Sequence, residues 1–91
     1  MDELEKAATV LQALKTAEQQ PPQAALPILN GLAGLVRGDP DASLEVQEVR
    51  ADVFMAICEL GKALHRGQPA DQLWSPALNA AERWRGLLGP A

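Results

Sequence analysis

The sequence predicts an all-α fold, a small four-helix domain made of two antiparallel helical hairpins. Alanine and leucine supply 30 of the 91 residues, whereas valine, isoleucine and threonine together supply nine and tyrosine is absent. Half-buried strands prefer β-branched and aromatic residues, so this composition favours helices. Four segments also repeat apolar residues at helical spacing, and proline and glycine separate them. A chain of this length has room for one domain, which we expect to span residues 1–91.

The first expected helix covers residues 2–19. Asp2 and Glu3 lie favourably at the positive end of the helix dipole. Its end is set by Gln19-Gln20-Pro21-Pro22, because proline lacks the amide hydrogen and disfavours helical geometry in the residue before it. Its apolar stripe consists of Leu4, Ala7, Leu11 and Leu14.

The second expected helix begins between Pro22 and Pro27, since a proline is tolerated in a first helical turn. Gly31 and Gly34 each cost about 1 kcal/mol relative to alanine in a helix interior, which makes this helix intrinsically the weakest of the four. We favour close approach of a neighbouring helix as the reason for both glycines, over a hinge or a ligand contact. The positions expected to face inward are Leu26, Leu29, Leu32 and Val36.

The third expected helix, about residues 41–66, is the longest, and we expect it to be the central one. Before it, Gly38-Asp39-Pro40-Asp41 forms a tight connection in which Asp39 or Asp41 can cap the helix. After it, Gly67-Gln68-Pro69 stops the helix. Its apolar stripe consists of Val46, Val49, Val53, Ile57, Leu60 and Leu64.

The last expected helix has two candidate starts. Asp71 can act as the N-cap, or Ser75 can act as the N-cap with Pro76 at the first helical position, and the second arrangement obeys the proline rule better. Pro76-Ala77-Leu78-Asn79 also echoes Pro27-Ile28-Leu29-Asn30, which could mark two related hairpins.

No set of residues supplies the chemistry of an enzyme, so we expect no catalytic residues, no cofactor and no metal. Cys58 and His65 are the only cysteine and the only histidine, and seven residues separate them, about 10 Å along one helix. A nucleophile and its base need hydrogen-bond contact, which this spacing denies. One cysteine and one histidine also cannot complete a zinc site. We interpret Cys58 as a small buried hydrophobic residue.

The charge balance disfavours nucleic acid as a partner. Twelve acidic residues against eight lysines and arginines give a formal net charge of −4, which repels a polyanion. Glu45, Glu48 and Asp52 fall on the polar face of the third segment and indicate a solvated acidic ridge. The alternative function is a small nucleic-acid-binding regulator. It would use one basic patch, formed if the last two helices pack antiparallel, of Lys62, Arg66, Arg83 and Arg85.

The favoured function is protein binding, by a small acidic adaptor, chaperone-like subunit or inhibitor that docks through apolar helix faces. Tryptophan and arginine are enriched at interface hot spots, although core packing of Trp84 is at least as well supported. The first and last helices offer more apolar positions than one small core is expected to hide, which predicts a homodimer through these helices. The competing possibility is a monomer that keeps this surface open for a partner. The candidate interface residues are Leu11, Leu14, Trp74, Trp84, Arg85 and Leu88.

The sequence predicts a cytoplasmic protein that does not cross a membrane. Its first residues are acidic where a signal peptide would be basic, and no apolar run approaches the ~18–20 residues of a membrane span. A single cysteine fits a reducing compartment. Abundant glycine, alanine, arginine and proline, which GC-rich codons encode, suggest a bacterial source.

Overall fold

Four α-helices account for 79% of the residues that the computed structural model describes, which are 2–37 and 41–89. No strand occurs among these residues, so the all-α prediction is confirmed. The helices are α1 (Glu3–Glu18), α2 (Pro22–Leu32), α3 (Leu44–His65) and α4 (Asp71–Leu88).

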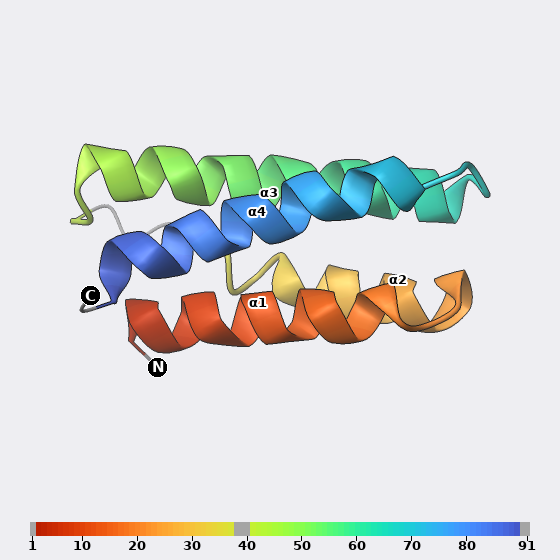
Figure 1. Cartoon of the computed structure of the whole chain (residues 1–91), viewed down its shortest axis with the longest axis horizontal. Helices are drawn as coiled ribbons and strands as arrows, with labels where there is room; N and C mark the ends of the chain where they lie inside the picture. The colour runs from red at the N-terminus through yellow and green to blue at the C-terminus, as the bar shows by residue number, and fades with distance from the viewer. Residues whose placement is uncertain (1, 38–40, 90–91) are drawn as a thin grey trace.

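Successive helices run in opposite directions, so that the chain forms two antiparallel hairpins, α1–α2 and α3–α4 (Figure 1). Each helix packs against two others: α1 contacts α2 and α4, and α3 contacts the same two. Within the described residues, the backbones of diagonally opposite helices do not approach each other closely. The expectation that the third helix is central is therefore wrong, because the four helices surround one shared core.

The second helix is much shorter than the helix it packs against. At 1.5 Å per residue, the 11 residues of α2 extend about 16 Å, and the 22 residues of α3 about 33 Å. A turn follows α2, and Val36 in this turn is buried. A Cβ atom added at Gly31 or Gly34 would meet no atom within 4 Å. The close-approach interpretation of these glycines is therefore wrong, because both face open space.

Ser43 caps the third helix. Its hydroxyl oxygen accepts a hydrogen bond from the Val46 amide at 3.3 Å, the usual arrangement for an N-cap serine. The predicted cap was Asp39 or Asp41. Asp39 lies outside the described residues, and Asp41 precedes the true cap by two positions. Asp2 caps α1 in the same way and accepts from the Glu5 amide at 2.8 Å.

This capping predicts different effects for two serine-to-alanine substitutions. Ser43→Ala should lower the free energy of unfolding by about 1 kcal/mol, because the first turn of α3 loses its side-chain acceptor. Ser75→Ala should change it by less than about 0.5 kcal/mol, since exposed Ser75 lies inside α4 and alanine is the better helix former. Urea denaturation followed by circular dichroism measures both. An equal loss at the two positions would contradict the assignment of the caps.

The last helix begins at Asp71, not at the favoured Ser75–Pro76 start, and Ala70 precedes it without a side-chain cap. Pro76 is tolerated as the sixth residue of α4, where its missing amide leaves one early helical bond unmade. Trp74 is 8% exposed, and its burial in the first turn, worth about 2 kcal/mol, offsets much of that loss. Pro27 is likewise the sixth residue of α2, so the tetrapeptide echo marks equivalent positions in the two hairpins.

The core is aliphatic apart from two tryptophans and one charged residue. Arg50 is only 5% exposed, and its Nη1 donates a hydrogen bond to Oε1 of Glu3 in an ion pair. This pair joins α1 and α3, whose backbones do not approach each other closely within the described residues. The largest fully buried side chains are Trp84, Leu14, Leu29, Leu60, Val10 and Val53.

Candidate functional site

The structure places most of the predicted interface residues in the core. Their exposed fractions are 5% for Leu11, 0% for Leu14, 8% for Trp74 and 0% for Trp84. Arg85 is exposed and Leu88 is half-buried, so only these two retain surface. The apolar surplus expected on the first helix is covered because α1 packs against both α2 and α4. The argument for a homodimer through the first and last helices therefore no longer holds.

The basic residues of the alternative function do not form one patch. Arg83 Nη2 lies 3.9 Å from Asp52 Oδ2, which fixes this part of α4 beside the first half of α3. Lys62 follows Asp52 by ten residues, about 15 Å along the helix axis. Antiparallel packing therefore separates Lys62 and Arg66 from Arg83 and Arg85, and the prediction of a single patch is wrong.

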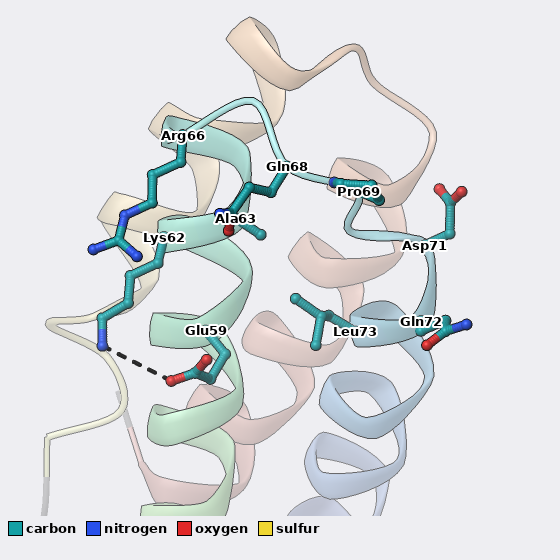
Figure 2. Close-up of a pocket in the computed structure, with 9 residues that line it drawn as sticks. All are labelled: Glu59, Lys62, Ala63, Arg66, Gln68, Pro69, Asp71, Gln72 and Leu73. Atoms are coloured by element: carbon teal, nitrogen blue, oxygen red, sulfur yellow. Dashed lines mark ion pairs between the residues drawn. The ribbon is translucent and has the colours of Figure 1, made fainter.

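Lys62 and Arg66 instead lie beside the connection between α3 and α4, where they line a polar hollow (Figure 2). The same hollow contains the carboxylates of Glu59 and Asp71. Lys62 Nζ is 3.8 Å from Glu59 Oε1, and both side chains are more than 60% exposed. An exposed pair of this kind contributes less than about 1 kcal/mol. The hollow combines both charge signs in open solvent, so it lacks the features of a selective ligand site.

Exposed apolar side chains gather on α3. Leu44 is 71% exposed, Met55 65% and Phe54 42%. Ala51 and Met55 lie one turn apart on one side of the helix, and Phe54 lies next to them. Leu44 falls in the same row one turn before exposed Glu48, which separates it from Ala51. We call Leu44, Ala51, Phe54 and Met55 the apolar face of α3.

A groove runs beside this face, along the seam between α2 and α3. It consists of two hollows of about 390 and 450 Å³ that share Ala33. From Gln47 to His65 it follows α3 for eighteen residues, about 27 Å. We call it the α2–α3 groove. One hollow is lined by Leu26, Leu29, Asn30, Ala33, Ile57, Cys58, Gly61, Lys62 and His65, and the other by Ala33, Val36, Arg37, Gln47, Arg50, Ala51 and Phe54.

Small residues account for the depth of the groove. A Cβ atom added at Gly61 would meet nothing within 4 Å, so the wall of α3 is open at this position. Ala33 and Cys58 leave similar room on either side. The opposite wall is uncharged, because α2 contains no acidic or basic residue. The groove is therefore mostly apolar, and its charged side chains come only from α3 and from the segment after α2.

The lining of the α2–α3 groove is basic although the chain is acidic. Among the described residues, Lys62, His65, Arg37 and Arg50 line it, and no aspartate or glutamate does. Arg50 is engaged by Glu3, and Lys62 makes only the exposed pair with Glu59 at 3.8 Å, so Lys62 and Arg37 are the exposed cations of the rim. The acidic ridge predicted on the third helix lies outside the groove, with Glu45, Glu48 and Asp52 all exposed.

Cys58 and His65 line the same hollow, although seven residues separate them. Cys58 is half-buried and His65 is exposed. In the part of the chain that the structure describes, no three histidine, cysteine, aspartate or glutamate side chains gather closely enough to hold a metal ion. Within the same residues, no helix is both long and apolar enough to cross a membrane.

Comparison with protein-family models, with curated proteins and with solved structures found no match to this chain. The candidate site is therefore defined by geometry alone, as the α2–α3 groove and the adjoining apolar face of α3. Sequence analysis missed both. A signal for the face was present, because Leu44, Phe54 and Met55 are apolar residues outside the predicted inward stripe of the third helix.

Proposed function

We propose that this chain is a non-catalytic protein-binding module, of the adaptor, chaperone-like or inhibitor kind, that docks a partner on the apolar face of α3 and the α2–α3 groove. The observation that carries the proposal is the exposure of Leu44, Phe54 and Met55 on one helix. Apolar residues clustered at a surface mark interaction sites more often than scattered ones do. Fully burying each of these side chains against a partner is worth about 1.5–3 kcal/mol.

The test is capture of a partner from the native source by immobilised protein, with matched surface variants. In the double variant Phe54→Asp/Met55→Asp, two carboxylates replace the centre of the apolar face, so partner capture should fall at least about tenfold. Leu87→Asp is the matched control, since Leu87 is 39% exposed but lies on α4. Circular dichroism checks that each variant keeps its helices. A partner retained by the double variant and lost by the control would contradict the proposed surface.

The proposed lack of catalysis gives a separate prediction. Cys58→Ala and His65→Ala should each leave the biological activity of the chain unchanged, because neither residue has a partner set suited to nucleophilic or acid–base chemistry. The measurement is the effect of each variant on the function of the captured complex. If either variant folds normally yet loses that function, a chemical role for the groove replaces the binding role.

A homodimer through the apolar face of α3 is the second candidate, favoured because Leu44, Phe54 and Met55 lie together on a single helix. Closed two-fold dimers are the commonest assembly of soluble chains. Light scattering at micromolar concentration distinguishes the two arrangements. A mass at the 9.7 kDa of one chain supports an open surface, and twice that mass supports self-association.

A further inference from the structure

We propose that the α2–α3 groove binds an acidic amphipathic helix of a partner protein. This inference rests on the proposed protein-binding function and specifies the chemistry of the partner. Amphipathic helices dock by laying an apolar face into a hydrophobic groove, with anchors at positions i, i+3, i+4 and i+7.

The dimensions of the groove suit a helix. Its α3 wall, from Gln47 to His65, extends about 27 Å, the length of an 18-residue helix of five turns. Residues 26–37 of α2 and the segment after it form the other wall. Ala33, Cys58 and Gly61 keep its walls low, so a helix can approach α2 and α3 closely. Phe54 borders the same groove and is 42% exposed, which makes it the largest apolar side chain available to an incoming helix.

The charges of the groove select an acidic occupant. Among the described residues, Lys62 and Arg37 line it and no carboxylate does, in a chain whose net charge is −4. Two other hollows combine both charge signs: the one beside the α3–α4 connection has Glu59 and Asp71 with Lys62 and Arg66, and the α1–α4 hollow has Glu82 with Lys15 and Arg85. Complementary charges of this kind favour one class of partner and disfavour the opposite class.

The two rim cations also determine how far apart the carboxylates of the partner helix should lie. Lys62 borders one hollow, and Arg37 borders the other beside Arg50. Twelve residues of α3 separate Lys62 from Arg50, about 18 Å along the axis. An acidic helix that pairs with both cations therefore carries its carboxylates about three turns apart, on either side of its apolar stripe.

The probes are two synthetic 18-residue amphipathic helices without cysteine. Both have leucines at i, i+3, i+4 and i+7, one has glutamates along its flanks, and the other has lysines at the same positions. Fluorescence anisotropy of dye-labelled peptide measures affinity. Cys58, the only cysteine of the chain, lines the groove, so its rate of alkylation reports occupancy of this site in the wild-type protein.

We expect the glutamate peptide to bind at least about tenfold more tightly than the lysine peptide at low salt, with the difference reduced in 1 M salt. At a peptide concentration about ten times Kd, alkylation of Cys58 should slow about tenfold, since only the free protein reacts. The double variant Arg37→Glu/Lys62→Glu should reverse the preference between the two peptides.

Two glycine variants control for position. Gly61→Leu places a side chain in the open wall of the groove and should abolish binding of the glutamate peptide. Gly86→Leu makes the same change at a helical glycine of α4 that is also open to solvent, and it should leave binding unchanged. If Gly61→Leu does not fold, the charge-reversal double variant decides the question by itself, because both its sites are exposed.

The remaining outcomes separate this inference from the proposed function. Equal binding of both peptides with equal protection of Cys58 overturns the acidic preference, while the protein-binding role stands. Binding without protection of Cys58, or no binding of either peptide, also overturns the inference, and the Phe54/Met55 capture experiment then judges the proposed function independently. A wild-type dimer that Gly61→Leu converts to a monomer identifies a second copy as the occupant and likewise overturns it.

Discussion

Replacing Trp84 with alanine is expected to lower the free energy of unfolding by about 3–5 kcal/mol. Trp84 is 0% exposed and is the largest fully buried side chain of the described residues. Its removal leaves a cavity that the four helices cannot close without shifting. The total free energy of unfolding of a domain of this size is only about 5–15 kcal/mol. The variant should therefore unfold at a markedly lower urea concentration. Urea titration followed by circular dichroism measures the change.

Trp84→Phe is the matched control. The indole Nε1 of Trp84 is buried without a hydrogen-bond partner among the described residues. A buried donor left unpaired costs about 1–3 kcal/mol, and phenylalanine removes that cost while keeping an aromatic ring in the core. We therefore expect Trp84→Phe to lose no more than about 1–2 kcal/mol. If Trp84→Ala lost less than Trp84→Phe, the packing role of this residue would be contradicted.

Breaking the Arg50–Glu3 pair from the acidic side is expected to cost about 2–4 kcal/mol, because Glu3→Ala leaves a buried guanidinium without its carboxylate. The side chains are 6% and 19% exposed, respectively, so water compensates the remaining charge poorly. Arg50→Met should cost less, about 1–2 kcal/mol, because the Glu3 carboxylate that it leaves is the more exposed partner and lies in the first turn of α1.

The double variant Glu3→Ala/Arg50→Met isolates the coupling between the two residues. Most of the loss caused by Glu3→Ala should disappear in it, because the buried guanidinium that loses Glu3 is removed as well. Additive losses in this cycle would show that the ion pair does not link α1 to α3. Chemical denaturation of the four proteins under identical conditions gives the coupling free energy directly.

Local rules predicted the helices because each boundary depends on a few neighbouring residues. Consecutive prolines at 21 and 22 separate α1 from α2. Gly67, the one glycine with positive φ (69°) among the described residues, ends α3 where the sequence indicated. The same rules failed where tertiary packing prevails. Pro76 suggested a helix start, yet burial of Trp74 draws the preceding turn into α4.

Arg50 shows what periodicity could have revealed. It falls in register with Val46, Val53 and Ile57, at spacings of four, three and four, which is the pattern of a buried stripe. Its charge led to its omission from the predicted stripe, which contained Val49 in its place. Its burial depends on Glu3, 47 residues away, and no local rule connects the two.

The predicted interface failed for a different reason. Whether an apolar stripe is surplus depends on how many neighbours cover it, and periodicity gives only its width. Each helix here has two neighbours, so the wide apolar stripe of α1 is buried against both α2 and α4. The uncovered surface lies instead on α3, because α2 is half as long and leaves one side of α3 partly open.

Amide chemical-shift mapping of the ¹⁵N-labelled chain, titrated with the captured partner, most directly tests the claim that recognition uses the α2–α3 side of the bundle. We predict that the largest shifts occur in residues 26–37 of the α2 side and 44–65 of α3, with Phe54, Met55 and Gly61 among them. Shifts confined to α1 and α4, with α3 unchanged, would contradict this account.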